Sequence, residues 1–88
     1  TATIVAAMES FETLRHQVVC ITGAGLLGLT AAAIARSRDA EGVIVVDPSE
    51  FRRHQACAFG ATHAVAPDEL PSVVREVTHG HGIDLALE

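Results

Sequence analysis

Apolar and polar positions along the chain fall into blocks that predict short buried strands separated by helices. Continuous β-branched runs at Val18–Thr22 and Val43–Val46 are typical of strands that are covered on both faces, as in parallel sheets. A shorter run at His63–Val65 and an apolar run at Ile83–Glu88 predict two further strands. The intervals between these runs have helical character, so the chain is expected to alternate strand and helix.

Local signals mark where the helices begin and end. Three helices are expected after the first strand: Leu26–Arg38, Glu50–Phe59, and a third from Asp68 to a stop at Gly80 or Gly82. Ser49 can cap the second of these helices, and Gly60 can end it with a left-handed conformation. A helix over Thr1–Leu14 is also expected, because its apolar residues recur four and three positions apart.

Alternating strands and helices predict the α/β fold class. We expect a partial Rossmann fold, a doubly wound parallel sheet with strand order 3-2-1-4, preceded by a connecting helix. Residues 1–17 would form the connecting helix and linker, and residues 18–88 a nucleotide-binding domain truncated after its fourth strand. The apolar fourth strand would then be an open edge, which natural proteins avoid. We therefore expect the chain to belong to a larger polypeptide or to need a partner along that edge.

A glycine motif joins the first strand to the first helix after it. Gly23, Gly25 and Gly28 have the G-x-G-x-x-G spacing of dinucleotide-binding turns. In such turns the first glycine permits a tight bend, the second lets the backbone approach a pyrophosphate, and the third packs the helix against the strand. Leu26 and Leu27 begin a helix whose N-terminus offers free N–H groups and partial positive charge to a phosphate. Taken alone, the motif is also compatible with a tight turn that binds no ligand.

An acidic residue closes the second strand. Asp47 lies about 20 residues after Gly28, where a carboxylate accepts hydrogen bonds from the adenosine ribose of NAD and repels the 2′-phosphate of NADP. Arg52, in the first turn of the next helix, could reach the same ribose or the phosphate edge, or accommodate a 2′-phosphate. Asp47 makes NAD the preferred cofactor. Methyltransferases that use S-adenosylmethionine also have an acid here, but their G-x-G-x-G turn and its preceding acid are absent.

The composition limits the classes of partner and the location. Eleven acidic residues against six arginines give a net charge of −5, so no basic patch is available for nucleic acid. No apolar run approaches the ~20 residues that a membrane-spanning helix needs. Cys20 and Cys57 are expected to be two buried, inert thiols and not a disulfide, which indicates a reducing cytoplasm.

Catalytic residues and metal ligands are not predicted in this chain. His79 and His81, at a glycine-rich helix end, suggest a metal site but are too few, and a flexible surface loop is expected there. His16, His54 and His63 are scattered, with no cysteine or acid to complete a ligand set. No nucleophile, base and orienting group converge in the predicted fold.

The motifs together resemble a known family. The segments G-A-G-L-L-G at Gly23–Gly28, F-G-A-T-H at Phe59–His63 and G-x-G-I-D-L-A-L-E at Gly80–Glu88 are similar to the coenzyme domain of medium-chain, zinc-type alcohol dehydrogenases. The resemblance extends from about Val18 to Glu88. The leading helix is similar to the segment that connects the catalytic and coenzyme domains of that family.

The resemblance implies an NAD-dependent parent enzyme that transfers hydride between an alcohol and the nicotinamide. Its partners would be a small alcohol, aldehyde or ketone and, as a full-length homo-oligomer, other copies of itself. The cofactor would be held by seven positions of this chain: Gly23, Gly25, Leu26, Leu27, Gly28, Asp47 and Arg52. Zinc would be bound by residues outside this chain. The chain alone would not be catalytic. The alternatives are a zinc-free quinone or enone reductase of the same superfamily and a non-catalytic nucleotide-binding module.

Overall fold

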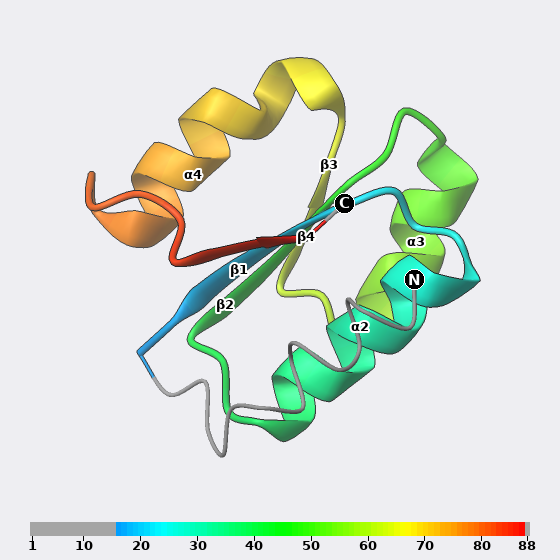
Figure 1. Cartoon of the computed structure of the whole chain (residues 1–88). Coiled ribbons are helices and arrows are strands. Elements are labelled where there is room, and N and C mark those ends of the chain that lie inside the picture. Colours follow the sequence, from blue (N-terminus) through cyan, green and yellow to red (C-terminus); the bar gives the residue numbers. More distant parts are fainter. Residues whose placement is uncertain (1–15, 88) are drawn as a thin grey trace.

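A four-stranded parallel sheet with the order β3-β2-β1-β4 forms the centre of the structure, a computed structural model that describes residues 16–87 (Figure 1). Its strands are β1 (Val18–Thr22), β2 (Gly42–Val46), β3 (His63–Val65) and β4 (Leu85–Leu87). Its helices are α2 (Leu26–Ser37), α3 (Glu50–Ala58) and α4 (Leu70–Thr78), with a short 3₁₀ turn, η1, at Pro67–Glu69. The predicted fold class and strand order are confirmed. The helix predicted over Thr1–Leu14 lies outside the described residues.

Both faces of the two central strands are covered, as their continuous apolar runs predict. On one face, Val19, Ile21, Val43 and Val45 pack with the buried alanines of α2 and with Ala56 of α3. On the other face, Val18, Cys20, Ile44 and Val46 pack with partly buried valines of α4. Figure 1 shows α2 and α3 on one side of the sheet and α4 on the other. Because side chains alternate along a strand, β1 and β2 each contribute to both clusters.

Two elements differ from the predicted boundaries. The segment predicted to begin a helix at Asp68 begins instead with the 3₁₀ turn η1. An α-helix there would need a hydrogen bond from residue 71 to the Pro67 carbonyl, and Pro71 has no N–H to donate. The fourth strand is shorter than predicted and begins at Leu85. Before it, Asp84 is tied to the start of β1, since its N–H donates to the Val18 carbonyl at 3.0 Å and its Oδ2 accepts from the Val18 N–H at 2.8 Å.

The register of the sheet positions the residues that follow the strands. β1 and β2 pair over their whole length, and Thr22 is opposite Val46. Because parallel strands end at the same edge, the turn after β1 and the turn after β2 lie side by side. Gly23 and Asp47, the next residues of the two strands, therefore meet at this edge.

Candidate cofactor-binding site

Two of the three motif glycines are required by the geometry of the protein itself. Gly23 has φ 91°, in the region that favours glycine, and its N–H donates to the Val46 carbonyl at 2.7 Å. Gly28 packs so closely on this turn that a Cβ added there would lie 2.0 Å from the Gly23 carbonyl oxygen. The first glycine thus makes the turn, and the third lets α2 approach it.

Gly25 has no such requirement. Its φ of −76° is accessible to any residue, and a Cβ there would meet nothing within 4 Å. It is the N-cap of α2, where no side chain supplies a capping bond and the first turn carries no acidic residue. Among residues 16–87, no side chain caps the first N–H groups of α2, and the helix adds partial positive charge beside Gly25. This cradle fits a phosphate group.

The two leucines after Gly25 lie at the rim of the cradle. Leu26 is 80 % exposed and Leu27 is 42 % exposed, although both are large apolar residues in the first turn of α2. Apolar side chains of this size are usually covered in a folded domain. Their exposure beside the helix N-terminus gives the site an apolar border.

Asp47 is buried at the end of β2, with only 3 % of its surface exposed. Its Oδ2 accepts from the Ala24 N–H at 2.9 Å, and its Oδ1 accepts from the Ser49 N–H at 2.8 Å. The carboxylate therefore links the glycine turn to the turn between β2 and α3. Each oxygen retains a second lone pair for a ligand.

Hydrogen bonds to the backbone keep this carboxyl ionised. The Ala24 N–H is the main cause that lowers the pKa of Asp47, and burial opposes it. The Ser49 N–H lowers the pKa further, as do the nearby charges of Arg52 and Arg53. A carboxyl stabilised in its charged form is the acceptor that two ribose hydroxyls need.

The two arginines of α3 make different contacts with Asp47. Arg52 Nη1 lies 4.0 Å from Asp47 Oδ2, and the Arg52 side chain is 59 % exposed. Arg53 Nη1 instead donates to the Asp47 carbonyl at 2.8 Å. Sequence reasoning identified Arg52 and missed Arg53. The only signal was that two adjacent arginines follow the acid within one helical turn of the start of α3.

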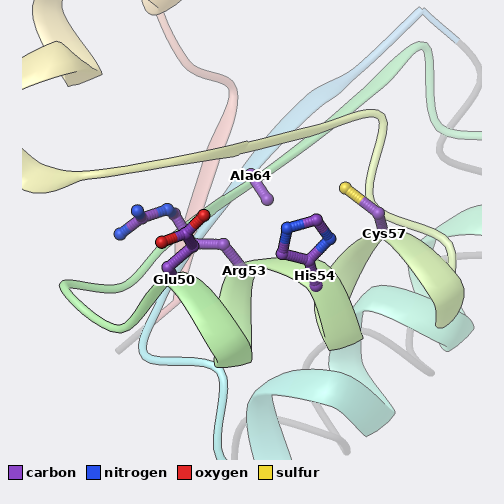
Figure 2. Close-up of a pocket in the computed structure, with 5 residues that line it drawn as sticks. All are labelled: Glu50, Arg53, His54, Cys57 and Ala64. Carbon is purple, nitrogen blue, oxygen red and sulfur yellow. The ribbon is translucent and has the colours of Figure 1, made fainter.

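A hollow of about 240 Å³ runs along α3, beside the site and separate from the glycine turn. Figure 2 shows its lining: Glu50, Arg53, His54 and Cys57 from α3, and Ala64 from β3. Cys57 is exposed here, so the prediction that both thiols are buried is wrong for Cys57 and holds for Cys20. The reason is that α3 buries only Ala56, and the next residue on a helix points about 100° away.

The described part of the chain has no fitting site for a metal ion. Within residues 16–87, no three His, Cys, Asp or Glu side chains come together in a way that could hold one. These described residues therefore do not fit a zinc centre. The helices of the same residues are also too short or too polar to cross a bilayer.

Comparison with known proteins identifies the family. The sequence model of the zinc-binding dehydrogenases matches residues 27–88. This chain belongs to that family. The L-threonine 3-dehydrogenase of Pyrococcus furiosus is 44 % identical over 72 residues, which cover 80 % of this chain and 21 % of the relative. A probable alcohol dehydrogenase of a Pseudomonas species is 36 % identical over 85 residues, which cover 94 % of this chain and 27 % of the relative.

Solved structures agree with this assignment. An alcohol dehydrogenase from Thermotoga maritima superposes with a TM-score of 0.87 at 35 % identity, and the match covers 97 % of this chain and 25 % of that one. The chain therefore spans about a quarter of the length of the relatives that it matches. The predicted resemblance to zinc-type alcohol dehydrogenases is confirmed, and the relatives support a dehydrogenase-type oxidoreductase.

Proposed function

We propose that this chain binds the adenosine and diphosphate half of NAD for a dehydrogenase that transfers hydride between an alcohol and the nicotinamide. The observation that carries the proposal is the open, uncapped N-terminus of α2 at Gly25, directly beside the carboxylate of Asp47. When bound, NAD supplies the group that accepts the hydride. The residues of this chain bind and orient it.

The diphosphate is held by the backbone of the glycine turn in this proposal. Leu26 and Leu27 begin α2, and no side chain of the described residues caps their N–H groups, so these groups would donate to phosphate oxygens. The absence of a side chain at Gly25 lets the diphosphate approach the backbone. The exposed leucine side chains would be covered by the bound nucleotide.

The ribose is held at the end of β2. Asp47 accepts hydrogen bonds from the ribose hydroxyls with the lone pairs that its backbone contacts leave free. The same negative charge repels a 2′-phosphate, so NAD is preferred to NADP. Arg52 is exposed and close enough to Asp47 to contact the ribose or the neighbouring phosphate.

The rest of the proposal concerns the whole protein. Residues 18–88 would form part of its coenzyme domain, and residues 1–17 would connect that domain to the catalytic part. Substrate-binding and zinc-binding residues would lie outside the chain, in a homo-oligomeric protein of the reducing cytoplasm. The names of the relatives point to a secondary alcohol such as that of threonine, or to a simpler alcohol, as the substrate class.

Titration of the full-length protein with NADH and NADPH, followed by nicotinamide fluorescence, tests cofactor binding. We expect saturable binding of NADH and at least tenfold weaker binding of NADPH. Equal or tighter binding of NADPH would overturn the preference for NAD, and no binding of either nucleotide would overturn the function. Competition by ADP shows whether the adenosine diphosphate half binds on its own.

Activity assays separate the enzyme classes. We expect the full-length protein to reduce NAD with L-threonine or a simple alcohol, and residues 1–88 alone to show no turnover. NADPH-dependent reduction of a quinone without alcohol oxidation would favour a zinc-free reductase instead. NADH binding without either activity would favour a non-catalytic nucleotide-binding module.

A further inference from the structure

Each polar group of Asp47 is held by a different neighbour at the sheet edge. Its N–H donates to the Val65 carbonyl at 3.1 Å, and its carboxylate oxygens accept from the N–H groups of Ala24 and Ser49. The Asp47 carbonyl accepts from Arg53 Nη1 at 2.8 Å. Of these four contacts, only that of Arg53 comes from a side chain of another residue. It is therefore the one that a substitution of a neighbour can remove while Asp47 itself stays unchanged.

The position of Arg53 in α3 directs its guanidinium back over the turn. Its N–H donates to the Ser49 carbonyl at 3.0 Å, so its backbone belongs to the first hydrogen-bonded turn of the helix. Its side chain lies in the hollow beside Glu50, as Figure 2 shows, and the bond to the Asp47 carbonyl is partly buried. A hydrogen bond from a charged donor in such a place is stronger than a neutral one and is less screened than a surface ion pair.

Arg52, the preceding residue, provides the contrast. Its guanidinium is mostly exposed and lies at 4.0 Å from Asp47 Oδ2, so the pair is screened by water and holds little in place. The exposed Arg52 side chain is accessible to a ligand, whereas the Arg53 side chain is engaged with the backbone of the turn. Two adjacent, chemically identical residues thus have separate tasks.

We propose that Arg53 is a positioning residue for the diphosphate cradle. By fixing the Asp47 carbonyl, it fixes the turn between β2 and α3 and keeps the carboxylate in reach of the Ala24 N–H. That bond in turn holds the glycine turn in the conformation that receives the diphosphate. The proposal rests on the nucleotide-binding function stated above and adds a residue that does not itself touch the nucleotide.

The test compares three substitutions in the full-length protein. Arg53→Met keeps the apolar stem and removes the donors, and Arg53→Lys restores one charged donor. Arg75→Met makes the same exchange at an exposed arginine of α4 and is the matched control. Hydrogen exchange of the segments 22–28 and 47–53, measured without ligand, reports on the two turns. Dissociation constants for ADP and NADH report on the cradle.

We expect faster exchange of both segments in Arg53→Met and about tenfold weaker binding of ADP and NADH, which corresponds to about 1.4 kcal/mol. Arg53→Lys should recover part of both signals, and Arg75→Met should match the wild-type protein. Unchanged exchange and affinity in Arg53→Met would overturn the proposal, as would faster exchange throughout the sheet, because the effect would then not be local.

A second variant keeps the test decisive if Arg53→Met does not fold. Arg53→Gln removes the charge and shortens the donor, and wild-type exchange together with wild-type ADP affinity in that variant would also overturn the proposal. Absence of nucleotide binding by the wild-type protein would instead refute the proposed function. In that case the exchange of the two segments still decides whether Arg53 positions the turn.

Discussion

Replacing Gly28 by alanine tests the close contact between α2 and the glycine turn. The added Cβ would stand 2.0 Å from the Gly23 carbonyl oxygen, a distance that must grow to at least 3.0 Å. The obstacle is backbone, so no side chain can rotate to relieve it. The turn cannot retreat freely either, because the Gly23 N–H is bonded to the Val46 carbonyl at 2.7 Å.

The magnitude follows from these two contacts. Forcing an extra methyl group into a packed position costs about 1–3 kcal/mol. If the turn moves to make room, weakening of the Gly23–Val46 bond adds about 1 kcal/mol. We therefore expect Gly28→Ala to lower the free energy of unfolding by about 2–4 kcal/mol. With a urea slope of about 2 kcal/mol per molar, the unfolding midpoint would fall by about 1–2 M.

Gly25→Ala is the matched control in the same motif. Its Cβ meets nothing within 4 Å and its φ is compatible with alanine, so the stability loss should be limited to about 1 kcal/mol from the poorer N-cap. Urea unfolding followed by circular dichroism measures both variants, and ADP titration measures the cradle. We expect Gly28→Ala to lose stability and Gly25→Ala to lose mainly ADP affinity. Equal midpoints for the two variants would refute the steric argument.

Three further predictions concern the edge of the sheet and α3. Because the pKa of Asp47 is lower in the folded protein, its contribution to stability should be complete at neutral pH and decline as the pH falls below about 4. In urea titrations, the difference in unfolding free energy between the wild-type protein and Asp47→Asn should narrow with acidification, and a constant difference would contradict this prediction. A thiol reagent should modify Cys57 in the folded protein and Cys20 only on unfolding, since burial shields the Cys20 thiol and raises its pKa. Peptide mass mapping measures the modification of each thiol, and equal modification rates would count against the prediction. Ser49→Ala should lower the free energy of unfolding by about 1 kcal/mol, because the Ser49 hydroxyl accepts a hydrogen bond from the Arg52 N–H in the first turn of α3. Ser72→Ala, at an exposed position of α4, is the control, and identical unfolding midpoints for the two variants would rule out a stabilising cap.

The central sheet could be predicted because its signal is local and continuous. A run such as Val43–Val46 is short, β-branched and apolar at every position, which is typical of a strand covered on both faces. Short strands that alternate with helices then leave few topologies, and the order β3-β2-β1-β4 is the one expected for a mononucleotide-binding half. The structural roles of Gly23 in the turn and of Gly28 in the close approach of α2 could be predicted too, because the motif spacing is also a local signal.

The exposure of Cys57 could not be predicted, because it depends on what covers each side of α3. Helical periodicity indicates which residues share a face and not which faces find a partner. Ala56 is the one residue of α3 that is buried, beside the short edge strand β3, and most other residues of this helix are exposed. A small apolar residue such as cysteine then lies in a hollow and not in the core.

The contacts of Asp47 show why sequence analysis identified the residue and missed its second task. The motif argument concerns the ligand, so it predicts a carboxylate that faces a ribose. The hydrogen bond from the Ala24 N–H joins residues that are 23 positions apart and depends on the register of β1 and β2. That register sets two turns side by side and leaves buried N–H groups that need an acceptor. The acid therefore has a structural task in the fold, in addition to the ribose contact that we propose for it.

This double requirement changes how a substitution at Asp47 has to be interpreted. A serine there would leave the buried Ala24 N–H and the partly buried Ser49 N–H with one hydroxyl between them, and an unsatisfied buried group costs about 1–3 kcal/mol. A fall in NAD affinity would then combine a lost ribose contact with a loosened glycine turn. Comparing two ligands separates these causes. A lost ribose contact would weaken the binding of adenosine and of ADP equally, whereas a loosened turn would weaken the binding of ADP more, because only ADP would place a diphosphate at the N-terminus of α2. Under the proposed function, cofactor preference at this edge would be coupled to the geometry of the glycine turn.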